Sequence, residues 1–173
     1  MWEALHSFFS NVRGRLRRDK PIPPDRRARK GNDSSTAPSI TLVALVVGDQ
    51  DRKLLAEISA RNQWSVHFTD TSGEAWVVLN QLKAPVILCD RDLPGTEWRD
   101  VVQMMASSAH SACTILLSRV VDDYLWNEVI GKGGYDVLAK PLREDDVVRS
   151  VRLAWSYWNS TTKMSQMPLK HYR

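Results

Sequence analysis

The stretch "PVILCDRDLPG", residues 85–95, contains the features that decide the fold. An apolar run from Val86 to Cys89 leads directly to Asp90, and a second acid, Asp92, follows before a Pro-Gly pair. A short apolar run bounded by turn residues predicts a strand buried on both faces, as in a parallel sheet. A buried carboxylate without a partner costs several kcal/mol, so we expect Asp90 to contact a cation or to have a chemical role.

The composition is typical of one globular domain with additional chain. The protein has 173 residues, of which 43% are hydrophobic, enough for one core. Cys89 and Cys113 lie in apolar runs without metal-ligand spacing, which predicts a reduced interior and argues against a disulfide framework or a zinc site. Neither a secretory signal nor an apolar stretch of the roughly 20 residues that span a membrane is found, so we expect a cytoplasmic protein.

Most of the excess positive charge lies in the N-terminal 38 residues, which hold nine Lys and Arg residues against four acids, while the rest holds fifteen against sixteen. Residues 1–18 predict a basic amphipathic helix with Trp2, Leu5, Phe9, Val12 and Leu16 on its apolar face. Such a helix would lie peripherally on an anionic membrane surface, dock in a partner's groove, or pack on its own domain. Residues 19–38 predict a disordered linker. The basic run at 26–30 is interpreted as solvated charge, so nucleic-acid binding is not expected.

After residue 38, short apolar runs alternate with segments of helical period, which predicts βαβ units. The predicted strands are residues 40–47, 64–68, 85–89, 113–118 and 135–139, and the predicted helices are residues 52–61, 72–82, 98–107, 122–132 and 144–158. We therefore predict an α/β fold over residues 39–158, a doubly wound five-stranded parallel sheet flanked by helices. A flexible tail is predicted at residues 159–173.

Polar residues gather where the predicted strands end. They are Gly48, Asp49 and Asp51 after the first strand, Asp90 after the third, Ser118 at the end of the fourth, and Lys140 and Pro141 after the fifth. Ligands of open parallel sheets bind beyond the carboxyl ends of the strands, so we expect these side chains to meet. At an effective dielectric constant near 20, Asp49 and Asp90 about 5 Å apart would repel by roughly 3 kcal/mol. This favours a Mg²⁺ ion, which typically takes one or two carboxylates and leaves room for a phosphate oxygen.

Residues 40–158 resemble the receiver domain of the two-component response-regulator family. The most specific elements are "VILCDRDLP" at 86–94 and "YDVLAKP" at 135–141. The resemblance implies the flavodoxin-like receiver fold of the chemotaxis response regulator. It also implies a phosphoacceptor module in phosphorelay signal transduction, that is, a switch and not an independent enzyme.

The resemblance further implies roles for individual residues. Asp90 would accept a phosphoryl group from a histidine kinase or a histidine phosphotransfer protein. Mg²⁺ would be held by Asp49, by Asp90 and by the backbone carbonyl of Asp92. Ser118 and Lys140 would bind phosphoryl oxygens, and phosphorylation would change the affinity of the face formed by the last strand and its flanking helices for an unknown downstream protein. That face would include Tyr124, Trp126, Trp155 and Tyr157.

Other positions modulate this site. Pro141 would follow a cis peptide bond and direct the lysine before it. Gly48 stands where the family normally has an acid, which predicts weaker Mg²⁺ binding. Arg119 stands where the family has a small residue, and its guanidinium would fill the pocket, pair with the phosphoacceptor or bind the phosphoryl group. Val137 and Trp98 also replace residues that are common in the family.

Two alternatives stay open from the sequence. Gly48 and Arg119 favour a pseudo-receiver, a protein-interaction module that works without phosphorylation. The Asp90-Arg91-Asp92 sequence also resembles the nucleophile motif of haloacid-dehalogenase-like phosphatases, although two βα units precede it and Pro94 occupies a position that is usually Thr or Val in that family.

Overall fold

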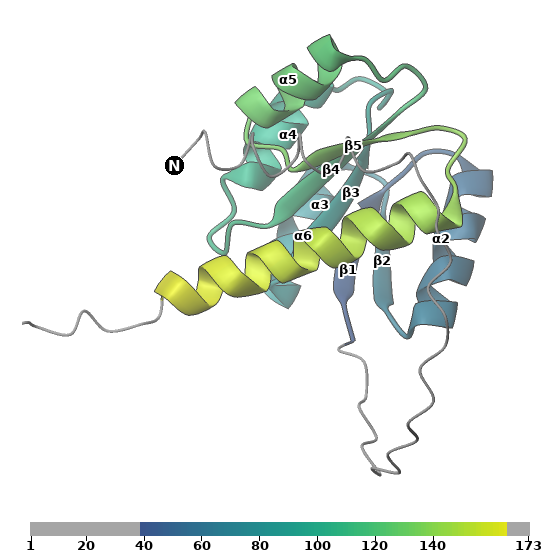
Figure 1. The fold of residues 1–173 in the computed structure, drawn as a ribbon. Coiled ribbons are helices and arrows are strands. Elements are labelled where there is room, and N and C mark those ends of the chain that lie inside the picture. Colours follow the sequence, from purple (N-terminus) through teal and green to yellow (C-terminus); the bar gives the residue numbers. More distant parts are fainter. Residues whose placement is uncertain (1–38, 166–173) are drawn as a thin grey trace, which may run out of the picture. The chain divides into compact units, whose positions relative to one another are not determined.

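Five parallel strands form a single sheet that runs through the centre of the structure (Figure 1). The computed structural model describes residues 39–165. The helix predicted at 1–18, the linker at 19–38 and the tail from residue 166 lie outside the described residues. The strands are β1 (Thr41–Leu45), β2 (Ser65–Thr69), β3 (Val86–Asp90), β4 (Cys113–Ser118) and β5 (Asp136–Ala139). Their order in the sheet is β2-β1-β3-β4-β5, which confirms the predicted doubly wound receiver-type fold.

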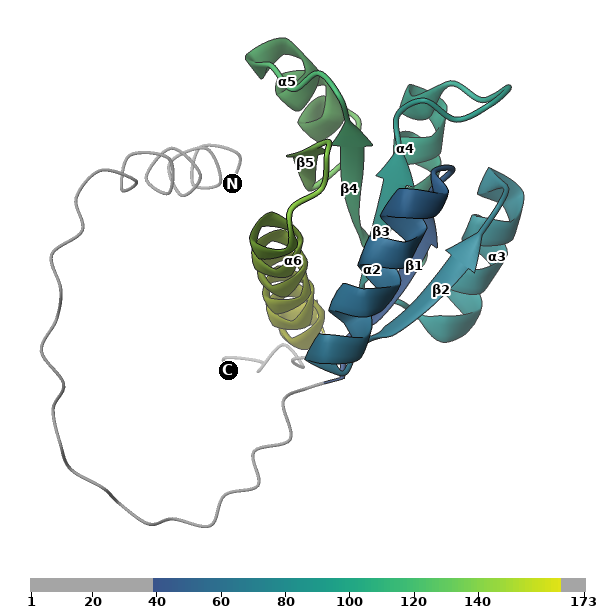
Figure 2. The ribbon, with the colours of Figure 1, turned by 90° about the vertical axis from the view of Figure 1, so that its right-hand side faces the viewer.

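Helices cover both faces of this sheet. They are α2 (Asp49–Asn62), α3 (Ser72–Leu82), α4 (Trp98–Ala106), α5 (Asp123–Gly131) and α6 (Glu144–Ser165). Alternate strand residues point to opposite faces, so each central strand contributes to two cores. Leu42 and Leu88 pack with α2 and α6, whereas Val43 and Ile87 pack with α3 and α4. Figure 2 shows α2 and α6 on one side of the sheet and α3 and α4 on the other. A third cluster joins α4 and α5.

The register brings the carboxyl ends of the strands to one edge of the sheet. Leu45 pairs with Cys89, and Asp90 pairs with Leu117 on the next strand. Ser118 in turn pairs with Ala139, the last residue of β5. The residues that follow these positions therefore lie close together, as the sequence predicts.

Two helix boundaries differ from the predicted ones by more than one residue. Helix α2 begins at Asp49, three positions before the predicted start at residue 52, because Gly48 serves as an extended N-cap and acids in the first turn suit the positive end of the helix dipole. Helix α6 continues to Ser165 beyond the predicted end at residue 158, so the flexible tail predicted for residues 159–173 is wrong for residues 159–165. Its continuation is anchored by the Trp158 indole N–H, which donates a hydrogen bond of 2.7 Å to the carbonyl oxygen of His110. Among residues 39–165, no helix combines the length and apolar character needed to cross a bilayer.

Candidate functional site

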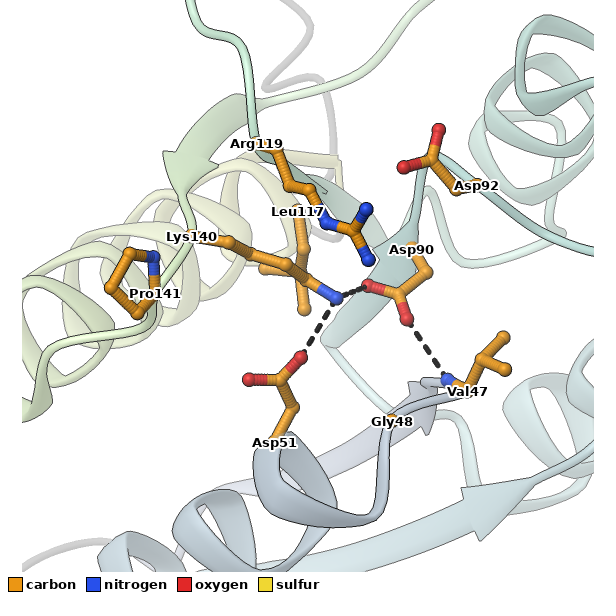
Figure 3. A pocket seen from close by; sticks show the side chains of 9 residues that line it. All are labelled: Val47, Gly48, Asp51, Asp90, Asp92, Leu117, Arg119, Lys140 and Pro141. Carbon is orange, nitrogen blue, oxygen red and sulfur yellow. Dashed lines mark hydrogen bonds and ion pairs between the residues drawn. The ribbon is translucent and has the colours of Figure 1, made fainter.

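A pocket of about 520 Å³ opens at the carboxyl edge of the sheet. It is lined by Val47, Gly48, Asp51, Asp90, Asp92, Leu117, Arg119, Lys140 and Pro141 (Figure 3). These residues come from the carboxyl ends of β1, β3, β4 and β5 and from the segments that follow them, so the pocket depends on the register of all four strands. Three carboxylates and two cationic side chains line it, which leaves a net negative charge.

Asp90 lies at the base of this pocket as the last residue of β3, and its side chain is only 5% exposed. Both carboxylate oxygens have partners. Oδ2 accepts a hydrogen bond of 2.9 Å from the backbone N–H of Val47, and Oδ1 pairs with the ammonium of Lys140. These two contacts offset the cost of burying the charge, and they answer the expectation that Asp90 needs a cationic partner.

Lys140 follows β5 and reaches back across the sheet edge (Figure 3). Its backbone N–H donates to the carbonyl oxygen of Ser118 at 2.8 Å, and its peptide bond with Pro141 is cis, as the resemblance implies. The ammonium contacts Asp51 Oδ2 at 2.8 Å as well as Asp90. Partial burial lowers the pKa of Lys140, but hydrogen bonds and charge attraction from the two carboxylates outweigh burial and hold this pKa above its usual value.

Asp49 and Asp51 lie in the same helical turn but in different surroundings. Asp51 lines the pocket, whereas Asp49 is exposed and is not among the lining residues. Residues two positions apart in an α-helix are separated by roughly 200° around the axis and do not share a face. The early start of α2 thus turns one acid toward Lys140 and the other toward solvent. The metal-binding role expected of Asp49 stays a prediction.

Ser118 is buried at the end of β4, and its hydroxyl is held within the local turn. Oγ donates to the carbonyl oxygen of Val120 at 2.7 Å and accepts from the N–H of Val120 at 3.2 Å. A guanidinium N–H of Arg91 donates to the same oxygen at 3.5 Å. The one proton of this hydroxyl is therefore already donated, and Ser118 is not among the pocket-lining residues. Its expected role toward a phosphoryl oxygen requires a rearrangement of this turn.

Arg119 and Asp92 lie nearer the mouth of the pocket. Figure 3 shows the Arg119 guanidinium turned toward the space above Asp90, while the Asp92 carboxylate lies apart from the central ion pairs. Arg119 is exposed. A planar guanidinium in this position suits an incoming tetrahedral oxyanion, because it can donate two parallel hydrogen bonds.

The carboxylates of the pocket offer oxygen ligands of the kind that Mg²⁺ prefers. In the described part of the chain, no three acidic, histidine or cysteine side chains are grouped as a metal site. Asp51 and Asp90 nevertheless converge on one cation, the Lys140 ammonium, which stands in for a metal charge between them. Because Mg²⁺ is typically held by one or two carboxylates and keeps several waters, two such oxygen ligands fit this ion.

The sequence groups Asp51 with the polar residues expected to meet at the strand ends but predicts no individual role for it. It does not predict the contact of the Val47 N–H with Asp90. The N–H of Val47 carries no residue-type signal at all. For Asp51, an acid three residues after a glycine N-cap was the available signal.

Comparisons with known proteins agree with this geometry. Residues 44–152 match the model of the family described as the response regulator receiver domain. The chain is 25% identical over 149 residues to the 3',5'-cyclic-nucleotide phosphodiesterase regA of Dictyostelium discoideum, an alignment that covers 83% of this chain and 19% of that protein. The chain thus spans about a fifth of the length of this curated relative.

Solved receiver structures show the same fold at low sequence identity. A response regulator from Thermotoga maritima superimposes with a TM-score of 0.62 at 18% identity, covering 69% of this chain and 99% of that one. The chemotaxis response regulator CheY4 of Vibrio cholerae does so with a TM-score of 0.62 at 13% identity, covering 68% and 99%. With the family match extending over more than half of its length, the chain belongs to the response regulator receiver domain family.

Proposed function

We propose that this receiver domain of two-component signalling accepts a phosphoryl group on Asp90. The observation that carries the proposal is the position of this carboxylate, which is buried at the base of a polar pocket and held by Lys140 and the Val47 N–H. The donor would be a phosphohistidine of a kinase or a phosphotransfer protein. Reading Asp90-Arg91-Asp92 as a phosphatase motif finds no support in the family match.

In the proposed transfer, a carboxylate oxygen of Asp90 attacks the phosphorus atom. The P–N bond to the donor imidazole breaks, a P–O bond to Asp90 forms, and the imidazole nitrogen leaves with the electron pair and takes up a proton. Lys140 would bind a phosphoryl oxygen, a role supported by the contact of its ammonium with Asp90. Ser118 would contribute only after giving up its bond to Val120. When bound, Mg²⁺ would supply positive charge for the phosphoryl oxygens, with affinity reduced because Gly48 offers no carboxylate.

The signal would leave through protein contacts on the face formed by α5, β5 and α6. Large exposed apolar side chains on these helices include Tyr124 on α5, which is 70% exposed, and Leu153 and Tyr157 on α6. Exposed aromatic residues are enriched in protein interfaces. Trp126 and Trp155 are partly buried and pack against the core clusters, so only part of each side chain is available for contact with a partner.

Intact-mass measurement tests the phosphorylation. The protein is incubated with acetyl phosphate and Mg²⁺, and the expected result is one phosphoryl adduct on the wild type, none on Asp90→Asn, and a retained adduct on Asp92→Asn. The Asp92 variant is the matched control because it removes a carboxylate two residues away at the pocket mouth. Absence of an adduct on the wild type would refute the proposal.

A second candidate, a pseudo-receiver that binds partners without phosphorylation, is favoured by a different observation. Both Asp90 oxygens and the Ser118 hydroxyl are already bonded within the chain. For this candidate, the wild type and Asp90→Asn would bind the downstream protein equally and neither would form an adduct.

Docking of the protein through residues 1–18, and its cytoplasmic location, remain predictions from the sequence. Deletion of residues 1–38 followed by cell fractionation tests both. An unchanged distribution between membrane and cytoplasmic fractions would count against a membrane role of this helix.

A further inference from the structure

The first turn of α2 carries two acids, and only one of them faces the pocket. We propose that Asp51, and not Asp49, is the second carboxylate ligand of a hard divalent cation that binds beside Asp90. The inference rests on the proposed function insofar as both use Asp90. Asp51, which lies within α2, would thus have the metal-binding role that the sequence predicts for Asp49.

Asp51 and Asp90 converge on one cation. Asp51 Oδ2 and Asp90 Oδ1 contact the same nitrogen, the Lys140 Nζ, so two carboxylates from different segments already share one positive charge (Figure 3). Their side chains are 20% and 5% exposed, which limits screening by water. Asp49 makes no comparable contact among the described residues and is exposed.

The absence of a side chain at Gly48 leaves space for the Asp51 carboxylate. A Cβ atom built on this glycine would lie 3.3 Å from Asp51 Oδ2, which is tighter than an ordinary van der Waals contact. The backbone of Gly48 is extended, with φ −78° and ψ 125°, so the glycine is not needed for its conformational freedom. Its missing side chain instead leaves room for the Asp51 carboxylate to turn back over the pocket. The two residues therefore act as a pair in which Asp51 occupies the space of the absent acid.

The contacts of the neighbouring Arg52 hold Asp51 in this position. The next residue, Arg52, donates to the carbonyl oxygen of Val46 at 2.9 Å and to that of Thr69 at 3.1 Å, and it pairs with Asp70 at 2.6 Å. These contacts attach the first turn of α2 to the ends of β1 and β2. The backbone N–H of Arg52 also closes the first helical turn on the carbonyl oxygen of Gly48. The direction of the Asp51 side chain is thus set by the sheet and not by a free loop.

Helix-dipole stabilisation does not explain this placement. Both acids of the first turn would favour the helix N-terminus to a similar extent, since both lie within one turn of it. Only the contact with Lys140 and the position in the pocket separate them. This makes Asp49→Asn a matched control for Asp51→Asn, with the same change of charge in the same helical turn.

Cation affinity tests the inference independently of phosphorylation. Binding of Mn²⁺ to the full chain is measured by electron paramagnetic resonance of the free ion, and Mg²⁺ is then added as competitor. We expect Asp51→Asn to weaken binding by about tenfold or more, the scale of effects seen around metal sites, and Asp49→Asn to leave it nearly unchanged. Thermal unfolding by circular dichroism shows whether each variant is folded.

A relocated acid provides the second variant. In Gly48→Asp/Asp51→Ala, the shortened side chain at position 51 opens the space that a Cβ at position 48 requires, and the new carboxylate should restore most of the lost affinity. Equal weakening by Asp49→Asn and Asp51→Asn, or no measurable binding to the wild type, would overturn the inference. A wild type that binds the cation but forms no phosphoryl adduct would refute the proposed function and leave the role of Asp51 standing.

Discussion

Replacing Lys140 with methionine would remove the charge that Asp51 and Asp90 share while keeping a side chain of similar length. Lys140 is 16% exposed on its side chain and lies between the two carboxylates, so methionine places an apolar group where both oxygens now have a cation. We expect this variant to be strongly destabilised, because it leaves two like charges facing each other in a partly buried pocket.

The size of the effect follows from the geometry. Because both oxygens contact one nitrogen, they lie within roughly 5 Å of each other, and at an effective dielectric constant of about 20 this gives a repulsion of about 3 kcal/mol. Removing one partner of a buried ion pair typically costs about 3–5 kcal/mol, so the two approaches agree. We therefore expect the free energy of unfolding of Lys140→Met to fall by about 3 kcal/mol.

Urea unfolding of a double-mutant cycle tests this reasoning. In the wild-type background, Asp51→Asn removes an attractive contact and should lower the free energy of unfolding. In the Lys140→Met background the same change removes a repulsion and should raise it, recovering most of the loss. Asp49→Asn should have little effect in either background. An Asp51→Asn substitution that destabilises both backgrounds would show that the three charges do not interact as the structure implies.

Three further predictions concern the rest of the domain. Hydrogen bonds from Arg99 hold the pKa of Glu128 below its usual value, so this pair stabilises the fold at neutral pH and its contribution is lost as the pH falls through the lowered pKa. Glu128→Gln should therefore lower the urea midpoint at pH 7 and lose this effect once the pH falls below the lowered pKa. Gly134→Ala would place a Cβ against the Val129 side chain and 2.9 Å from the Val129 carbonyl oxygen in α5, and it should reduce the unfolding free energy by about 1–3 kcal/mol. Gly131→Ala, whose Cβ would have nothing within 4 Å, should not reduce it. Burial raises the pKa of Cys113 to about 12, so mass spectrometry should find both buried cysteines unlabelled by iodoacetamide until urea is added, and labelling of the native protein would contradict this.

The fold could be predicted from the sequence because each of its signals is local and repeated. Every strand is a short apolar run, every helix has a buried face, and parallel pairing follows from their alternation. Asp90 and Lys140 could be placed for a related reason. Each ends or follows a strand, and strand ends meet at one edge of a parallel sheet whatever the details of the loops.

The remaining parts of the site depend on properties that a residue pattern does not specify. Whether an acid after β1 faces the pocket depends on the residue at which α2 begins, since one helical position rotates a side chain by roughly 100°. The predicted start at residue 52 would have left both acids in a loop, whereas the observed start at Asp49 separates them. The bonds of the Ser118 hydroxyl likewise depend on the conformation of the turn after β4, which no residue type determines.

The Lys140 ammonium, which contacts both Asp51 and Asp90, affects which ligands the pocket can bind. Lys140 contacts both carboxylates, so an incoming cation must compete with its ammonium for their oxygens, and an incoming phosphoryl group must compete with the carboxylates for the ammonium. The strength of these ion pairs therefore limits the affinity of the pocket for either ligand. Gly48 reduces the negative charge available for a metal, while Arg119 at the mouth adds positive charge that attracts an oxyanion. Both changes move the balance of the pocket from cation binding toward anion binding. Because weaker binding raises the metal concentration needed to fill the site, the wild type should require more Mn²⁺ for half-occupancy than a variant with an additional acid at position 48, and the Mn²⁺ affinities of the wild type and of Gly48→Asp measure that difference directly.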